Sequence, residues 1–164
     1  MPPPAPPDSL SQDIGISMQY PNLSSTLWLV RSLNSNNQFV VKASMYPNVE
    51  VLGTAIGGSV MYRRTMINNE SSYGGWELDL SLASARLGGV FAKRFSFGQV
   101  YIIPSLLGAM GNTWGLYLPV GISLWTQKHW GLHMEYNHLL ILSHGTNWNL
   151  DSFPNLSVGL SYRY

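Results

Sequence analysis

The 164-residue chain has no cysteine and few charged residues. Without cysteine, neither a disulfide framework nor a thiolate site is possible. Charged side chains make up 10% of the chain, whereas about 25% is typical of soluble domains. Because charged groups normally keep a protein surface wet, this scarcity predicts that part of the surface does not meet water.

Long apolar runs and basic clusters are also missing. No run of about 18 apolar residues occurs, which excludes a transmembrane helix. The formal net charge is +1 and no basic stripe is present, so we expect no nucleic-acid partner. The opening MPPPAPPDSL does not have the pattern of a signal peptide, and an exported protein would correspond to a mature form. We expect a Pro-rich extended tail over 1–12 and one domain over 13–164.

What the chain does contain is aromatic residues, glycine and period-two alternation. Aromatics reach 12%, with 9 Tyr and 6 Trp, and there are 16 Gly. Apolar and polar residues alternate in many segments separated by turn signals, which predicts β-strands. The expected strands cover about 13–20, 38–46, 52–63, 76–95, 99–108, 113–125, 129–139 and 155–164.

Three of these segments are ambiguous. The segment 76–95 is long for one strand, and a bulge near 84–89 would return Leu87 and Phe91 to the apolar face. In 99–108, Pro104 would remove a ladder hydrogen bond. The segment 26–33 is an additional strand candidate, which would make the strand count odd.

The connections predict an asymmetric barrel. Short turns are expected at 46–50, 95–98 and 126–129, and longer polar loops at 21–37, 66–75 and 140–154. The segment 108–112 is an exception, since it is short where this alternation predicts a longer loop. The fold class is therefore all-β, a closed antiparallel transmembrane β-barrel of about eight strands with short turns at one end and longer loops at the other.

The side-chain sizes indicate which face points inward. The polar faces carry mostly Gly, Ser, Ala and Asn, which suit a crowded interior, whereas the apolar faces carry bulky side chains that a narrow interior cannot hold. We therefore expect the apolar faces to meet lipid, where strands must close on themselves. Aromatics that we expect at the membrane–water interface are Tyr20, Tyr46, Trp76, Trp114, Trp130, Tyr162 and Tyr164.

From about Asp13 to Tyr164 the chain resembles the small bacterial outer-membrane β-barrels of the OmpA/OmpX type. The shared features are the alternating segment LSVGLSYRY with its aromatic last residue, the strand pattern and the loop asymmetry. The resemblance implies a porin-like protein of the Gram-negative outer membrane, with periplasmic turns and extracellular loops. It also implies contact with outer-membrane lipid and lipopolysaccharide, and recognition of the C-terminal strand by the barrel-assembly machinery. Another envelope protein is a further candidate partner.

The expected interior holds a polar network. Its members are Lys42, Arg63, Glu77, Asp79, His133, Glu135 and Arg163. One hypothesis is a pore lining or a catalytic pair of His133 and Glu135. The favoured interpretation is a plug, because small barrels fill their interior with side chains and buried charges must pair. Arg86 is expected to face inward as well.

The favoured function is a structural, adhesive or accessory membrane subunit that acts through its loops, without enzymatic activity, cofactor or metal. An alternative is an outer-leaflet lipid A-modifying hydrolase with Ser143, His144 and Asp151 in a loop. Adjacent Ser and His residues of a strand would point opposite ways. A second alternative is a soluble lipocalin-like ligand-binding barrel. Gly58 marks either a close-packing spot for another membrane protein or a bend of the barrel.

Overall fold

The computed structural model describes residues 12–21, 23–49, 53–109, 113–126, 129–144 and 148–164. The predicted tail over 1–12 therefore lies outside the described residues, apart from Gln12. In this part of the chain no helix is long and apolar enough to cross a membrane. The strands are β1 (Gln12–Tyr20), β2 (Ser24–Asn34), β3 (Asn37–Val49), β4 (Gly53–Asn68), β5 (Ser72–Ser81), β6 (Ser84–Phe95), β7 (Gly98–Ile102), β8 (Ser105–Ala109), β9 (Thr113–Thr126), β10 (Trp130–His144) and β11 (Trp148–Arg163).

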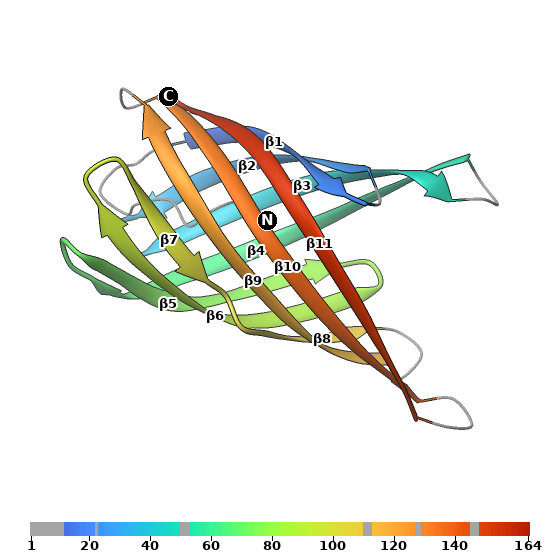
Figure 1. The fold of residues 1–164 in the computed structure, drawn as a ribbon. Coiled ribbons are helices and arrows are strands. Elements are labelled where there is room, and N and C mark those ends of the chain that lie inside the picture. The colour runs from blue at the N-terminus through green and yellow to red at the C-terminus, as the bar shows by residue number, and fades with distance from the viewer. Residues whose placement is uncertain (1–11, 22, 50–52, 110–112, 127–128, 145–147) are drawn as a thin grey trace.

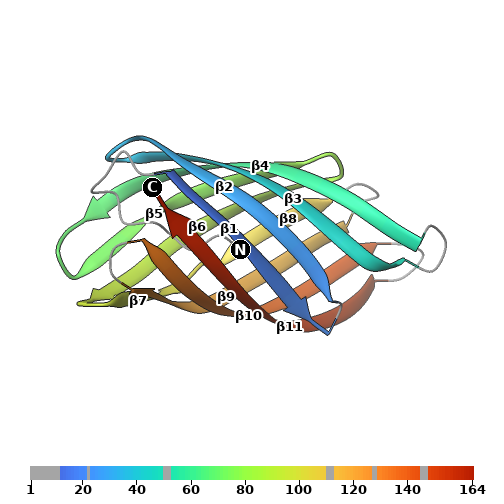
Figure 2. The ribbon, with the colours of Figure 1, turned by 90° about the horizontal axis from the view of Figure 1, so that it is seen from above.

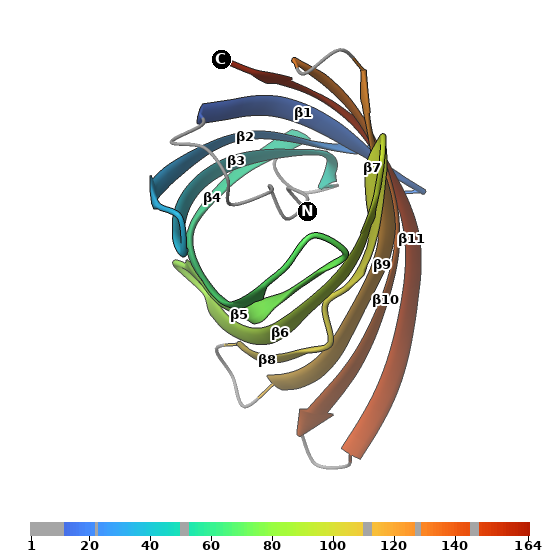
Figure 3. The ribbon, with the colours of Figure 1, turned by 90° about the vertical axis from the view of Figure 1, so that its left-hand side faces the viewer.

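The strands form one closed antiparallel barrel (Figure 1). Strands that follow one another in sequence pair with each other, except β7 and β8, and β1 closes the ring by pairing with β11, beside which it lies in Figure 2. Strands β7 and β8 both pair with β6 and β9. The eleven strands of the described residues therefore occupy ten positions around the ring that Figure 3 shows.

The predicted count of about eight strands is wrong for two reasons. The segment 26–33 is part of a full strand, β2, and the segment 76–95 is two strands, β5 and β6, rather than one strand with a bulge. The turn between them depends on Ser81, whose hydroxyl accepts hydrogen bonds from the backbone N–H groups of Ser84 (3.0 Å) and Ala83 (3.4 Å). A serine hydroxyl that hydrogen-bonds to the backbone can stabilise such a turn in a segment that has no glycine or proline.

Pro104 divides one barrel position into β7 and β8. Proline has no N–H and cannot donate to a neighbouring strand. The backbone N–H of Ile103 still donates to Pro119, and the Pro104 carbonyl accepts from Gly89, so the ladder continues on both sides of the break. Pro104, where the sequence predicted the loss of a ladder hydrogen bond, thus lies at the boundary between two short strands.

The predicted contrast between short turns and long loops is also wrong. All strand connections span two or three residues, because much of 21–37, 66–75 and 140–154 belongs to strands. The barrel has two ends, which we name by their residues. End A holds Gln12 and Arg163, and end B lies opposite. The asymmetry comes instead from two hairpins, β3–β4 and β10–β11, that project at end B (Figure 1).

The projecting hairpins carry strand edges that lack a neighbour within the described residues. Strand β4 pairs with β5 only from Ser59 onward, and β11 pairs with β1 only from Leu156 onward. The edges of β4 over 53–58 and of β11 over 148–155 therefore extend past the strands beside them.

The two faces of the barrel wall differ as the alternation predicts. Ile16, Leu118 and Val158 point outward and are 52%, 42% and 42% exposed, whereas Glu77 and Ser157 are buried at 0% and 3%. The interior also contains two apolar clusters. Their members are Trp28, Val30, Val40 and Met61 in one, and Tyr73, Val90, Ala92, Tyr101 and Ile103 in the other. The inside of the barrel is thus a packed core of mixed polarity.

Candidate functional site

The seven residues expected in the interior network all point into the barrel. Arg63 and Glu77 have no exposed side-chain surface, and the side chains of Lys42, Asp79 and Arg163 are 11%, 12% and 19% exposed. The other two, His133 and Glu135, are buried at 4% and 2%. Alternation places them there, because residues at even spacing on one strand share a face.

Five of the buried charges form one ionic cluster across β3, β4, β5 and β6. Glu77 accepts from Arg63 Nε (3.0 Å) and Nη2 (2.6 Å), and its other oxygen lies 2.7 Å from Arg86 Nη2. Asp79 contacts Arg86 (3.2 Å) and Lys42. Each carboxylate is therefore held between two cations, which offsets the cost of burying it. We call these five residues the ionic cluster.

The remaining network residues have separate partners. His133 Nε2 lies 2.6 Å from the Ser161 hydroxyl, and Glu135 accepts a hydrogen bond from the Tyr101 hydroxyl at 2.9 Å. Within the described part of the chain, His133 makes no hydrogen bond or ion pair with Glu135, so the structure does not bring the hypothetical catalytic pair together.

Arg163 belongs to the seam that closes the barrel. It lies opposite Asp13 in the pairing of β1 with β11, and its guanidinium donates to both carboxylate oxygens of Asp13 at 2.8 and 3.1 Å. The guanidinium also lies over the Trp125 ring, 4.3 Å from its centroid. A bidentate pair of this kind fixes geometry as well as charge, and here it fixes the register of the first and last strands.

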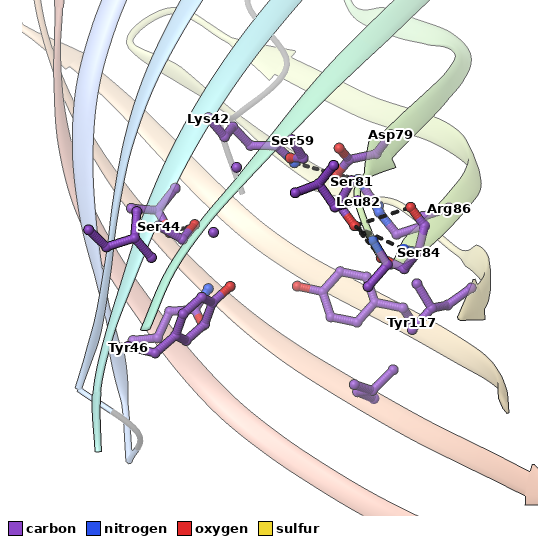
Figure 4. Close-up of a pocket in the computed structure, with 18 residues that line it drawn as sticks. Lys42, Ser44, Tyr46, Ser59, Asp79, Ser81, Leu82, Ser84, Arg86 and Tyr117 are labelled. Atoms are coloured by element: carbon purple, nitrogen blue, oxygen red, sulfur yellow. Dashed lines mark hydrogen bonds and ion pairs between the residues drawn. The ribbon is translucent and has the colours of Figure 1, made fainter. Parts of the chain in front are cut away.

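A cavity of about 460 Å³, lined by both polar and apolar side chains, lies on the end-B side of the ionic cluster. We call it the vestibule (Figure 4). Its wall includes Lys42, Asp79 and Arg86 from the cluster, the rings of Tyr46 and Tyr117, and the hydroxyl-bearing residues Thr26, Ser44, Ser59, Ser81 and Ser84. Leu82, in the turn between β5 and β6, also lines the cavity and is highly exposed.

Five of the seven aromatics expected at the membrane interface are exposed near one of the two ends of the barrel. Tyr20 and Trp114 are exposed near end B, and Trp130, Tyr162 and Tyr164 are exposed near end A. Trp76, on β5, packs against Tyr62 with ring centroids 5.5 Å apart. Tyr46 is 44% exposed, shares a face with Lys42 and Ser44, and also lines the vestibule (Figure 4).

The hydrolase candidates lie on strands rather than in a loop. Ser143 and His144 are consecutive residues of β10, and Asp151 lies on β11 opposite Ile141. In the described segments no group of three or more His, Asp or Glu side chains is arranged to hold a metal ion. His129 forms a hydrogen bond with the backbone oxygen of Arg163, and His138 forms one with the Ser152 hydroxyl.

Some residues of the site were not singled out by the sequence pattern. Tyr101 and Asp13 are buried and hold other network members, and Tyr117 contributes a wall of the vestibule. The sequence does contain one sign of the role of Tyr117, which is the size of its side chain. Tyr117 is a large residue on a strand face that otherwise carries Gly115, Pro119 and Gly121.

No protein-family model matches the chain, and no curated protein matches its sequence.

Proposed function

We propose that this protein is an integral β-barrel of a bacterial outer membrane that acts as a structural, adhesive or accessory subunit rather than as an enzyme. The observation that carries this proposal is the direction of the barrel wall. Bulky apolar side chains such as Leu118 and Val158 cover the outside, while the ionic cluster occupies the inside.

Physical chemistry favours lipid as the surrounding solvent. A barrel in water would place its bulky apolar residues inside and its charges outside, whereas here bulky apolar residues cover the outside and the ionic cluster lies inside. A closed ring satisfies the backbone hydrogen bonds that lipid cannot satisfy. Exposed Trp and Tyr near both ends suit the boundary between hydrocarbon and water.

The packed interior supports a role other than free conduction. Arg63 and Glu77 have no exposed side-chain surface, and Val40 and Met61, which lie opposite each other on β3 and β4, are fully buried as well. Small barrels of this kind are filled by their own side chains. The proposed barrel therefore presents surfaces to partners instead of a wide pore.

The projecting hairpins at end B are the proposed contact surface. The edges of β4 over 53–58 and β11 over 148–155 have backbone groups with no neighbouring strand in the described residues. Such edges accept an added strand from another protein. An accessory role at the outer side of the membrane would use these edges.

Fractionation tests the proposal. The protein, exported behind a signal peptide, is expected to sediment with the outer membrane and to migrate faster on a gel before boiling than after boiling. A protein that stays dispersed in aqueous buffer without detergent, and shows one gel mobility, would contradict the proposal and favour a soluble barrel.

A further inference from the structure

We infer that a groove on the outer wall of the barrel binds an anionic phospholipid, with one acyl chain across Gly74 and the phosphate group at Lys93. This inference rests on the proposed membrane location and deepens it by naming one lipid and its site. Three features of the groove support it: the missing side chain at Gly74, the apolar walls, and the single cation at the rim.

The groove crosses β4, β5, β6, β7 and β9, which lie side by side in the barrel wall (Figure 1). We call it the wall groove. Its volume is about 500 Å³, in the range of small-molecule sites, roughly 300–1,000 Å³. Five of its residues lie opposite one another in one row across these strands, namely Ile67, Gly74, Phe91, Ile102 and Val120.

Gly74 leaves a hollow in this row. It faces outward, since the preceding residue Tyr73 is buried inside the barrel, and a Cβ atom added at Gly74 would lie 3.5 Å from the Cβ atom of Ile67. The residues opposite Gly74 on its two sides, Ile67 and Phe91, are 57% and 56% exposed. The missing side chain therefore leaves space between two bulky apolar side chains, wide enough for a substituent at Gly74 to enter without a clash.

The apolar walls suit an acyl chain but do not select one lipid. Lipid tails are as apolar as the residues of the groove, so a chain that enters it gains packing rather than a hydrophobic driving force. A chain that fills the hollow gains dispersion contacts there. A preference for one lipid must therefore come from a polar group at the rim.

Lys93 supplies that group at the end-A rim of the wall groove. It lies on the outer face of β6 between the exposed Phe91 and Phe95, and opposite Ser72 and Val100 in the ladder. The Lys93 side chain is exposed, and within the described residues its ammonium group forms no hydrogen bond or ion pair. Its three N–H donors are thus open to the phosphate of a lipid whose chain lies across Gly74.

The charges around this rim favour an anionic headgroup. The exposed Lys and Arg side chains of the described residues are Arg31, Arg64 and Lys93, each within four residues of the end-A terminus of its strand. Basic residues at a membrane surface attract anionic lipids. The acidic residue nearest in the chain, Glu70, is exposed in the turn between β4 and β5 and forms no ion pair with Lys93. One cation at the rim suits a lipid with one phosphate group better than the multiply charged lipopolysaccharide.

Native mass spectrometry of the full-length barrel in detergent tests the inference. The probes are dioleoyl phosphatidylglycerol and dioleoyl phosphatidylcholine at equal concentration. Their chains are the same, but in phosphatidylcholine a choline cation neutralises the phosphate. We expect the barrel to retain one phosphatidylglycerol molecule, with a preference of about fivefold over phosphatidylcholine, the size of one basic residue's attraction to anionic lipid.

Two variants separate the chain from the charge. Gly74→Leu fills the hollow and is expected to reduce retention of both lipids several-fold, whereas Gly58→Leu, the same change at an exposed position near end B, leaves it unchanged. Lys93→Gln keeps the hollow and should remove the preference for phosphatidylglycerol. Its control, Arg31→Gln, lies on the exposed face of β2 near the same end and should keep the preference.

Equal retention of the two lipids by the native barrel, unchanged retention by folded Gly74→Leu, or a preference that survives in Lys93→Gln would overturn the inference. Stronger retention of lipid A than of phosphatidylglycerol, or a barrel dimer that Gly74→Leu abolishes, would also overturn it, because either assigns the wall groove to another occupant. A barrel that shows the gel-mobility shift but retains no phosphatidylglycerol contradicts this inference alone. A protein that stays dispersed without detergent contradicts the membrane proposal before any lipid is added.

Discussion

Gly15 leaves the space that the Trp28 ring fills inside the barrel. The two residues lie opposite each other on β1 and β2, and a Cβ atom at Gly15 would be 2.2 Å from a ring carbon of Trp28. Gly15→Ala should therefore lower the free energy of unfolding by about 1–3 kcal/mol, as overpacking does. Urea titration of the barrel folded in lipid or detergent measures this loss.

Gly58 provides the matched control for that substitution. It is exposed, and an added Cβ would meet the nearest atom, the Lys42 carbonyl oxygen, at an ordinary 3.4 Å. Gly58→Ala should change the stability by no more than about 0.5 kcal/mol. Equal losses for the two variants would show that Trp28 does not occupy this space.

Glu77 holds two arginines in the buried ionic cluster. Its replacement by glutamine leaves Arg63 and Arg86 without their shared counter-charge, although both stay buried. We expect Glu77→Gln to lower the free energy of unfolding by about 3–5 kcal/mol, measured by the same urea titration. Glu70→Gln, on an exposed turn, is the control and should have no measurable effect; a similar loss in both would contradict a buried cluster.

For single residues, the alternation of apolar and polar residues predicted which side of the barrel wall a side chain occupies, but not which residue it contacts. It placed Lys42, Glu77 and His133 on the inward side, where the structure has them. It did not pair Asp13 with Arg163, since that pairing depends on the closure of β1 against β11, 150 residues apart. The alternation also did not indicate that Tyr46, expected at the membrane interface, lines the vestibule.

At the scale of strands, the errors have physical causes. Strand β2 shows no clean alternation because its inward residues, Trp28 and Val30, are as apolar as its outward residues. The boundary between β5 and β6 was missed because Ser81 makes the turn in a sequence without Gly, Pro, Asn or Asp. The predicted pattern therefore gave the fold class but undercounted the strands.

The Ser81 turn can be tested directly. Ser81→Ala removes the acceptor for the backbone N–H groups of Ala83 and Ser84, and should cost about 1 kcal/mol of unfolding free energy. Ser81→Asp restores an acceptor of the kind that such turns use and should recover most of the loss. Thermal or urea unfolding compares the two, and equal destabilisation by Ala and Asp would refute the role of the hydroxyl.

For the whole molecule, the membrane proposal predicts a depth dependence. Val158 lies near the middle of the wall and Tyr162 near end A, both facing outward on β11. An arginine on the lipid face costs about 2–4 kcal/mol at the midplane and about 0–1 near the interface. Val158→Arg should therefore destabilise the reconstituted barrel much more than Tyr162→Arg, and equal effects would contradict a bilayer around this surface.

The most direct test of the central claim asks which solvent touches the outward side chains. Since the chain has no cysteine, a single cysteine at Ile16, Leu118 or Val158 carries one spin label, and Asp151 on the projecting hairpin serves as the aqueous reference. In vesicles, the three wall labels should collide with oxygen, which concentrates in lipid, and not with a water-soluble nickel chelate, whereas the label at Asp151 shows the reverse. Wall labels that collide with the nickel chelate as often as the label at Asp151 would contradict the account.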